Sequence, residues 1–435
     1  MHTYKKALVI GCGRSGRAAE ALLRSEHCLV RSICEEITPD YSYEDLHYDP
    51  EVAIVSPGVP LTHPWIKDLV ERGIPLLSEI ELGWSRRHCP VIAVTGSNGK
   101  STVVKWIVEA LACSGLRAVP CGNYGFPVCA AVLTPTVPDW LVMEVSSFQL
   151  ETIREFRPDI GVLLNVLPNH LDRHGSMQAY RDLKLRLFEN MQVTDTAVVP
   201  AEIFQTLEKN AENLPIIGKD SGTVSRHWKT FGIDEGADFW FHEGRVGTID
   251  LSGTWFDNDI LGLSAAAVAA VGAACGLPNE AVERSARQFE PLPHRMQVVA
   301  EMNGVTFIDD SKATNLAAMR AALKMCSGKV HLIAGGRSKE SDFSFAKDLL
   351  VRQVSRLYLI GEASPQMQSA WQDSVECLPC GTLEKAVGAA WERAEPGDTV
   401  LLSPACTSFD QFRSFGERGD CFKAAVCRLD GGGAE

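Results

Sequence analysis

Short apolar runs recur along this chain, and most are followed by small or polar residues and then by a stretch with helical spacing. The apolar runs lie at 7–10, 52–55, 91–94, 140–145, 160–165, 305–308, 330–334, 357–360 and 399–402. Predominantly apolar runs of this length predict strands that are buried on both faces. Their alternation with helical segments predicts doubly wound α/β domains built on parallel sheets.

The helical segments and the breaks between them predict three domains. Helices are expected at 18–23, 103–111, 180–188 and 264–275, and a last helix of the middle stretch at 284–289. The segment 291–293 contains two prolines in three residues, which interrupt both helix and sheet, and it is interpreted as a linker. The predicted domains are 1–89, 90–292 and 293–435.

The segment 95–102 reads Thr-Gly-Ser-Asn-Gly-Lys-Ser-Thr, between a predicted strand and a predicted helix. A glycine-bearing turn at a helix start lets backbone N–H groups bind phosphate oxygens. The lysine can then reach the terminal phosphates, and the serine hydroxyl can bind Mg²⁺. The loop is shorter than the usual phosphate-loop pattern. The succession of strand, loop, lysine–serine pair and helix nevertheless favours ATP binding over an ordinary turn. The candidate ATP-binding residues are Gly96, Ser97, Asn98, Gly99, Lys100, Ser101 and Thr102.

Composition and charge exclude several other classes. The formal net charge of −13 and the absence of a basic stripe disfavour nucleic acid as a partner. No apolar stretch reaches membrane-spanning length, so membrane insertion is not expected. The chain enters a predicted strand directly without a signal-like segment, and its 14 cysteines are scattered in apolar segments. A cytoplasmic location with free thiols is therefore expected.

A second glycine turn, Gly11-x-Gly13-x-x-Gly16, follows the first predicted strand. It matches the dinucleotide fingerprint, and Glu35 or Glu36 would be the acidic partner about 20 residues on. An NAD enzyme therefore stays open as an alternative. The same turn could equally hold the diphosphate of a UDP-sugar.

Three further candidates depend on their surroundings. Glu144 ends an apolar run where P-loop proteins keep a Mg²⁺ ligand, and without the loop it would be interpreted as an exposed glutamate. His170 and His174 are spaced four apart, but no third histidine or cysteine completes a zinc set. A role of His170 at a Mg²⁺ site and a surface histidine both stay open. Lys184 lies in an amphipathic stretch, and its spacing alone assigns it no role.

The last third of the chain carries three polar clusters directly after predicted strands. They are the segments 309–315, 335–339 and 403–409, which are rich in charged and hydroxyl side chains. In open α/β sheets, ligands bind beyond the carboxyl ends of the strands. Each cluster alone could be ordinary loop surface, but the three together indicate a site for an anionic substrate.

Taken in order, these motifs resemble the muramyl peptide ligases, the cytoplasmic enzymes of peptidoglycan synthesis. The resemblance covers essentially the whole chain. Two motifs, Ser-Ser-Phe-Gln-Leu-Glu at 146–151 and Leu-Ser-Pro-Ala-Cys at 402–406, resemble in particular the family member that adds D-glutamate. The other specific segments are 95–102, 180–190, 292–295, 310–315 and 410–412.

The resemblance implies an α/β enzyme of three domains. An N-terminal Rossmann-like domain would bind UDP, a central P-loop sheet would bind ATP, and a C-terminal Rossmann-like domain would bind the amino acid. The implied reaction is ATP-dependent addition of D-glutamate to UDP-N-acetylmuramoyl-L-alanine through an acyl phosphate, with two Mg²⁺ ions. These small molecules are the expected partners, and the chain is expected to be a monomer. Closure of the domains is expected to exclude water from the acyl phosphate.

The resemblance also implies roles for single residues. Lys100 and Ser101 would hold the γ-phosphate and one Mg²⁺, which Glu144 would also ligate. His170 and Lys184 would serve a second Mg²⁺, with Lys184 carrying CO₂ as a carbamate that supplies the oxygen ligands Mg²⁺ prefers. Further implied contacts are Ser15, Gly58, Asn123 and His170 for the UDP substrate, Arg295, Asp310 and Lys312 for the nucleotide, and Thr314, Lys339, Ser408, Phe409 and Phe415 for D-glutamate.

Some positions depart from the family pattern. Cys34-Glu35-Glu36 replaces Asp-Thr-Arg near the expected uracil, and Ser264 replaces an adenine-contacting asparagine. Asn169 replaces an aspartate, and Arg337-Ser338 replaces Asp-Gly. The alternatives to a D-glutamate-adding ligase are a related ligase with another acceptor, a folate-extending ligase, an NAD-dependent oxidoreductase and a non-catalytic nucleotide sensor.

Overall fold

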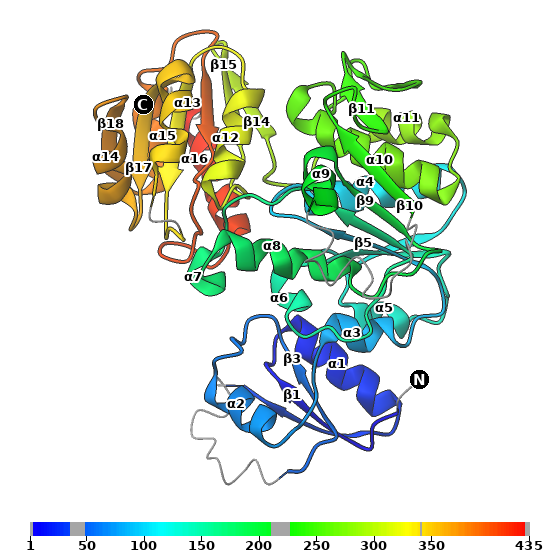
Figure 1. Ribbon diagram of the computed structural model, residues 1–435. Coiled ribbons are helices and arrows are strands. Elements are labelled where there is room, and N and C mark those ends of the chain that lie inside the picture. The colour runs from blue at the N-terminus through cyan, green and yellow to red at the C-terminus, as the bar shows by residue number, and fades with distance from the viewer. Residues whose placement is uncertain (1–2, 35–47, 210–226, 340–341, 431–435) are drawn as a thin grey trace. The chain divides into compact units, whose positions relative to one another are not determined.

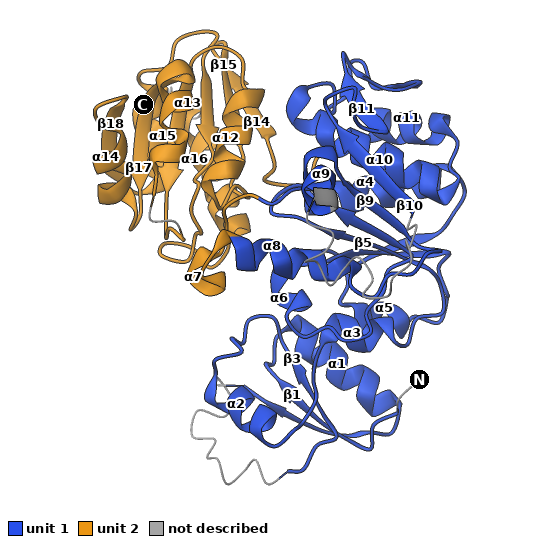
Figure 2. Ribbon diagram, viewed as in Figure 1, with its two compact units in different colours: residues 1–166, 178–289 blue, residues 167–177, 290–435 orange. Residues whose placement is uncertain are grey.

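The computed structural model describes residues 3–34, 48–209, 227–339 and 342–430. The chain divides into two compact units, coloured separately in Figure 2: unit 1 is Met1–Val166 with Gln178–Phe289, and unit 2 is Leu167–Met177 with Glu290–Glu435. Unit 1 contains two sheets and unit 2 contains a third (Figure 1). None of the described helices combines the length and the apolar character that crossing a bilayer requires.

The first sheet has four parallel strands in the order β2-β1-β3-β4. On β1, Ala7 and Val9 pack with α1, whereas Leu8 and Ile10 pack with α2 on the other face. The strands predicted at 7–10 and 52–55 are confirmed, but two short strands of this sheet were not predicted. Its elements are β1 (Lys6–Ile10), α1 (Arg14–Ser25), β2 (Leu29–Ile33), β3 (Val52–Val55), α2 (Pro64–Glu71), β4 (Leu76–Ser78) and α3 (Glu79–Trp84).

The second sheet has nine described strands in the order β13-β12-β11-β10-β9-β8-β5-β7-β6, and of their pairings only the two at the β13 end, β11 with β12 and β12 with β13, are antiparallel. The phosphate loop follows β5, which lies between β8 and β7 and is the third strand from the β6 edge of the sheet. Its strands are β5 (Val91–Thr95), β6 (Ala118–Gly122), β7 (Trp140–Glu144), β8 (Ile160–Leu163), β9 (Thr196–Pro200), β10 (His227–Gly232), β11 (Phe239–His242), β12 (Arg245–Val246) and β13 (Ile249–Asp250). Its helices are α4 (Lys100–Cys113), α5 (Val128–Val132), α6 (Ser147–Leu150), α8 (Met177–Leu185), the 3₁₀ turn Arg186–Phe188, α9 (Ala201–Lys209), α10 (Asp259–Cys275) and α11 (Asn279–Gln288).

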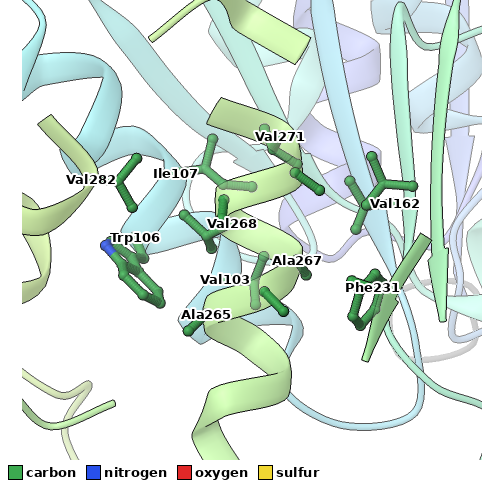
Figure 3. Close-up of a cluster of buried hydrophobic side chains, with 14 of the residues drawn as sticks. Val103, Trp106, Ile107, Val162, Phe231, Ala265, Ala267, Val268, Val271 and Val282 are labelled. Carbon is green, nitrogen blue, oxygen red and sulfur yellow. The ribbon is translucent and has the colours of Figure 1, made fainter. Parts of the chain in front are cut away.

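One face of this sheet is covered by α4, α10 and α11, whose apolar side chains form the cluster in Figure 3. Trp106 of α4 stacks on Phe256 at 3.6 Å between ring centroids and donates a hydrogen bond to Ser285 at 2.8 Å. The alanine-rich α10 lies close against the sheet, because a Cβ added at Gly262 would lie 2.2 Å from the Phe241 ring. This packing fixes α4, and therefore the loop at its start.

Unit 2 carries six strands in the order β14-β15-β19-β16-β17-β18, of which only β14 pairs antiparallel. Because β15, β19 and β16 are neighbours, the loops after these strands share one edge of the sheet. Leu332 of β16 faces α12, α13 and α14, and Ile333 faces α15 and α16. The elements are α7 (Leu171–His174), β14 (Gln297–Met302), β15 (Val305–Asp309), α12 (Leu316–Met325), β16 (Val330–Gly335), the 3₁₀ turn Ser344–Ala346, α13 (Lys347–Gln353), β17 (Val354–Ile360), α14 (Ser364–Trp371), β18 (Glu376–Gly381), α15 (Leu383–Trp391), β19 (Thr399–Leu402) and α16 (Phe415–Asp430).

Candidate active site

The phosphate loop joins β5 to α4 in unit 1. β5 ends at Thr95, and α4 begins at Lys100 with Gly99 as its N-cap residue. Gly96 and Gly99 have φ angles of 153° and 88°, which residues with a side chain rarely adopt. The glycines therefore permit the turn that directs backbone N–H groups toward the start of the helix, where anions bind. The predicted strand, loop and helix are confirmed.

Asn165, from the segment after β8, holds this loop. Its side-chain Oδ1 accepts hydrogen bonds from the backbone N–H groups of Ser97 and Asn98, both at 3.0 Å. Its Nδ2 donates to the Asn98 carbonyl at 3.1 Å. Sequence reasoning missed this residue, although its place directly after a strand neighbouring β5 is a signal that could have found it.

Ser101 and Glu144 lie together beside the loop. The Ser101 hydroxyl donates to Glu144 Oε2 at 2.6 Å, and the Asn123 amide donates to Glu144 Oε1, also at 2.6 Å. Glu144 is 3% exposed and ends β7, next to β5. A hydroxyl and a carboxylate oxygen are donors that Mg²⁺ prefers, so this pair fits a magnesium site. Asn123, expected at the UDP substrate, here orients the carboxylate.

Two lysines converge on the loop backbone. Lys100 Nζ donates to the carbonyls of Gly96 and Ser97 at 2.7 and 3.0 Å. Lys184 Nζ, from α8, donates to the same Gly96 carbonyl at 2.9 Å and lies 4.5 Å from the centroid of the Tyr180 ring. The structure therefore places Lys184, which only the family resemblance had associated with the phosphate loop, beside Lys100, Ser101 and Glu144.

Lys184 is only 1% exposed, which is unusual for a lysine in a nine-residue amphipathic helix. Burial lowers the pKa of its amine well below the ordinary value, and the positive charge of Lys100 lowers it further, against the opposing effect of Glu144. A lysine with a strongly lowered pKa presents a neutral amine, which is a nucleophile. This chemistry fits reaction with CO₂.

Other positions of unit 1 that the sequence analysis singled out lie in helices α4, α6 and α10. A Cβ added at Gly99 would lie 3.8 Å from Ser264 Oγ, so Ser264 of α10 is close to the phosphate loop. Thr102 is buried in the first turn of α4. The motif 146–151 forms a capping box at the start of α6. The Ser146 hydroxyl accepts a hydrogen bond from the Gln149 backbone N–H, and the Gln149 side chain accepts one from the Ser146 backbone N–H.

The first glycine turn connects β1 to α1. A Cβ added at Gly16 would lie 1.8 Å from the Gly11 carbonyl oxygen, so packing alone requires glycine there. Ser15 is half-buried in the first turn of α1, and Gly58 is exposed in the turn after the neighbouring β3. Cys34 is buried after β2. Glu35 and Glu36, the predicted acidic partners, lie outside the described residues.

In unit 2, the predicted nucleotide residues gather after β15. Asp310 is 1% exposed, accepts a hydrogen bond from the Ser403 hydroxyl at 2.9 Å and lies 3.7 Å from Arg295 Nη1. Burial raises the pKa of this carboxyl to about 6, although the charge of Arg295 opposes the rise. Lys312 Nζ lies 5.6 Å from the centroid of the Phe415 ring, so its charge faces an aromatic surface.

A second pair, which sequence reasoning missed, lies beside Asp310. His294 Nδ1 is 2.7 Å from Asp309 Oδ2, and Asp309 is fully buried. A Cβ added at Gly419 of α16 would lie 2.1 Å from the same ring nitrogen. The pair is therefore enclosed between the β15 strand end and α16, next to Arg295 and Asp310 in the chain.

The residues predicted for D-glutamate occupy the loops after β15, β16 and β19 and the start of α16. Ser408 is buried, Thr314 is partly exposed, and the Phe409 and Phe415 side chains are 64% and 38% exposed. Exposed aromatic side chains beside a buried hydroxyl form a surface with both apolar and polar character, which suits a small ligand.

Lys339 and His170 meet in unit 2. Lys339 Nζ lies 3.5 Å from His170 Nδ1, and His170 has a φ of 55° before the short helix α7. Asn169 is buried beside it. His170 and Lys339 belong to unit 2, whereas Lys184 and Glu144 belong to unit 1. In the same region, Arg337 pairs with Glu362 at 2.9 Å on the surface.

The phosphate loop, its strand-end carboxylate and its parallel sheet define a protein of the P-loop nucleotide-binding class. Residues 94–240 match the Mur ligase middle domain, and residues 294–406 match the Mur ligase glutamate ligase domain. The chain therefore belongs to the Mur ligase family. The resemblance that the sequence motifs indicate is confirmed.

Individual relatives agree with this assignment. The chain is 38% identical over 395 residues to a UDP-N-acetylmuramoylalanine–D-glutamate ligase of Syntrophotalea carbinolica, covering 88% of this chain and 85% of that protein. It is 34% identical to a ligase of the same name from Koribacter versatilis over 98% of both chains. The crystal structure of MurF ligase from Thermotoga maritima in complex with ADP matches with a TM-score of 0.61 and 20% identity, over 91% of this chain and 92% of that one, and so supports the fold.

Proposed function

We propose that this chain is an ATP-dependent ligase that joins D-glutamate to UDP-N-acetylmuramoyl-L-alanine during the synthesis of peptidoglycan precursors in the cytoplasm. The observation that carries the proposal is the likeness, over 98% of the chain, to relatives named as D-glutamate ligases. The phosphate loop with its Ser101–Glu144 pair supports the ATP-dependent step. The strand-end loops of unit 2 support binding of a small anionic amino acid.

The reaction balances as a carboxylate activation followed by amide formation. A carboxylate oxygen of the alanine residue attacks the γ-phosphorus of ATP, ADP leaves, and an acyl phosphate forms. The amine of D-glutamate attacks the acyl carbon, loses a proton, and phosphate departs with the carboxylate oxygen. Lys100 and the backbone N–H groups at the start of α4 hold the phosphates during the first step.

The metal-binding roles are those that the family resemblance implies, and the donor atoms present on each unit support them. Ser101 and Glu144 would hold one Mg²⁺, and His170 with a carbamylated Lys184 would hold a second. Bound Mg²⁺ supplies positive charge that offsets the charge on the transferring phosphoryl group. Asn123 fixes the orientation of Glu144, and Asn165 keeps the loop in shape.

The surroundings of Lys184 support the carbamylation that the family resemblance implies. The neutral amine nitrogen would attack the carbon of CO₂, an electron pair of one C=O bond would move to oxygen, and a proton would leave. The product carries a negative charge next to the ammonium of Lys100. The positive charge of Lys100 already disfavours a protonated Lys184, because it lowers the pKa of that amine. The carbamate therefore places a negative charge beside the positive charge of Lys100, which is a favourable pair.

The remaining substrate contacts are proposed by domain. The domain 1–89 would bind the UDP substrate through Ser15 and Gly58, with help from Asn123 and His170 of other segments. The domain 90–292 would bind the ATP phosphates. The domain 293–435 would bind the nucleotide through Arg295, Asp310 and Lys312 and D-glutamate through Thr314, Lys339, Ser408, Phe409 and Phe415.

The test is an acceptor panel with product mass. Purified protein is supplied with Mg²⁺, ATP, bicarbonate and UDP-N-acetylmuramoyl-L-alanine, and then with D-glutamate, L-glutamate, L-alanine or a diamino acid. We expect phosphate release and one new product, of the mass of the D-glutamyl amide, with D-glutamate alone. Coupling of another acceptor in preference to D-glutamate would contradict the proposed specificity, and no coupling of any amine would contradict the ligase activity.

A further inference from the structure

A fully buried arginine lies beneath the strand-end loops of unit 2. Arg418 is in α16, in the second turn of that helix, and its side chain is 0% exposed. No motif in the sequence assigned it a role. Burying a guanidinium is costly unless its donors are satisfied, so the contacts that satisfy them deserve a functional explanation.

The guanidinium binds two of these loops directly. Its Nε donates to the Ser311 hydroxyl at 2.9 Å, and its Nη2 donates to the Ser311 carbonyl at 2.8 Å, after β15. Both Nη atoms donate to the Cys406 carbonyl at 3.1 Å, after β19. The Ser311 hydroxyl in turn donates to the Phe415 carbonyl at 2.7 Å, which ties the start of α16 to the same point.

The third loop, after β16, packs against the same group. A Cβ added at Gly336 would lie 3.2 Å from Arg418 Nη1, so the backbone approaches the guanidinium closely. The next residue, Arg337, exchanges backbone hydrogen bonds at 3.0 Å with Thr407 of the β19 loop. Arg418 is therefore at the point where the loops after three neighbouring strands come together.

These loops carry the residues that the proposed function assigns to two different substrates. Ser311 lies between Asp310 and Lys312, which are proposed for the nucleotide. Cys406 is two residues before Ser408, which is proposed for D-glutamate. A shift of the guanidinium would move both loops together, because the same planar fork bonds to both.

The charge of Arg418 suits this task. Its hydrogen-bond acceptors among the described residues are neutral: a hydroxyl and two backbone carbonyls. Burial lowers the pKa of the guanidinium to about 10, so the group stays charged at neutral pH. A charged donor gives stronger hydrogen bonds than a neutral one, and the rigid fork fixes their directions.

We propose that Arg418 is a positioning residue that fixes the nucleotide-binding loop and the D-glutamate-binding loop relative to one another, so that the two substrates are bound by one rigid unit. This inference rests on the proposed function for the identity of the substrates. Arg418 acts through Ser311 and Cys406 and is not proposed to touch either substrate.

The test is Arg418→Lys, which keeps the positive charge but loses the fork. We expect the KM for ATP and the KM for D-glutamate both to rise, each by about tenfold, because charge-assisted hydrogen bonds that shape both loops are lost. The affinity for UDP-N-acetylmuramoyl-L-alanine, measured by calorimetry, should stay within about twofold of wild type. The matched control is Arg413→Lys, an exposed arginine in the segment before α16 that pairs with Glu417.

A merely structural role would lower the melting temperature and the fraction of active enzyme without raising either KM. That result, or a rise in only one of the two KM values, would overturn the inference. If Arg418→Lys does not fold, Ser311→Ala removes one acceptor of the fork and should still raise both KM values, and unchanged values would then overturn it. A wild-type enzyme that makes no D-glutamyl product refutes the proposed function instead, so the two failures are distinguishable.

Discussion

Among the described residues, each unit has one basic side chain that is at most 1% exposed, and burial affects the two differently. Lys184 of unit 1 is 1% exposed and Arg418 of unit 2 is 0% exposed, and both donate to backbone carbonyls of strand-end loops. Burial lowers the pKa of Lys184 well below the ordinary value, whereas the pKa of Arg418 falls only to about 10. Burial therefore favours the neutral amine of Lys184, whereas the arginine remains a cation at neutral pH.

The higher ordinary pKa of a guanidinium and the neighbours of each group together explain the difference. Lys184 faces a second lysine, Lys100, which binds the same Gly96 carbonyl, so two positive charges there repel each other. Arg418 spreads its charge over a planar fork whose donors meet the hydroxyl and carbonyls of two loops. Similar burial thus favours a neutral amine in one unit and leaves a charged, hydrogen-bonded guanidinium in the other.

We expect the largest effect from a substitution that replaces Lys184 with a permanent cation. Both buried side chains are then guanidinium groups, and the difference between the two units is removed. Lys184→Arg should lower kcat by about 10²–10³-fold, because a guanidinium does not deprotonate in proteins and cannot form the carbamate. The measurement is steady-state phosphate release at saturating substrates. Lys67→Arg, an exposed lysine on α2, is the matched control. A Lys184→Arg enzyme as active as this control would contradict a chemical role for Lys184.

We expect the second-largest effect in the wild-type enzyme when CO₂ is removed. This experiment probes the chemistry of Lys184 without a mutation. In degassed buffer at acidic pH, wild-type activity should fall by about tenfold, since acid protonates the amine and the carbamate releases CO₂. Added bicarbonate should restore the rate in wild type and leave Lys184→Arg unchanged. Full activity in the degassed acidic assay would show that Lys184 works without CO₂.

A smaller effect concerns the buried carboxyl near Arg418. Burial raises the pKa of Asp310 to about 6, so the carboxyl takes up a proton as the pH falls through that value. With bicarbonate saturating, the KM for ATP should rise below pH 6 in wild type. Asp310→Asn should have a KM that is several-fold higher, about fivefold, and nearly independent of pH. Asp310→Asn with the wild-type pH profile would exclude Asp310 as the titrating group.

We expect the smallest effect on the stability of the fold, from a buried carboxyl group that lies away from both Lys184 and Arg418. Glu79 of α3 accepts from the Cys129 N–H at 2.6 Å, while its Oε2 has no partner among the described residues. Burial raises its pKa from 4.5 to about 7, so the folded state binds a proton more tightly than the unfolded chain. The stabilisation is complete below pH 4.5 and is lost as the pH rises through 7.

Glu79→Gln, which is neutral at every pH, should therefore lose less stability than wild type between pH 5 and 8. The expected difference in melting temperature is on the order of 5 °C, measured by calorimetry across that range. Parallel curves for the two proteins would show that Glu79 does not titrate there. Because Glu79 lies outside both sites, it separates a general effect of burial from the specific effects at Lys184 and Arg418.

Motifs that are contiguous in the chain could be predicted from the sequence, whereas contacts between distant residues could not. The phosphate loop, its strand and its helix are contiguous in the chain, so the sequence alone predicted them. The short strands β12 and β13 and the partly exposed β2 were missed, because their apolar patterns are too short or too interrupted. The family resemblance singled out Lys184, whose helical spacing is that of an ordinary solvated lysine.

The residues that hold the sites in shape were missed for a different reason. Asn165 bonds loop residues 67 and 68 positions away, and Arg418 bonds Ser311 across 107 positions. No local pattern encodes which distant backbone a polar side chain will meet. His294 and Asp309 illustrate the same limit, since only the fold shows that they pair.

An oxygen-transfer measurement tests the ligase chemistry most directly. UDP-N-acetylmuramoyl-L-alanine labelled with ¹⁸O in its terminal carboxylate is turned over with ATP, Mg²⁺ and D-glutamate, and the released phosphate is examined by mass spectrometry. Passage through an acyl phosphate predicts that each phosphate carries one ¹⁸O from the carboxylate. Unlabelled phosphate, released together with the amide product, would contradict activation of the carboxylate by phosphorylation.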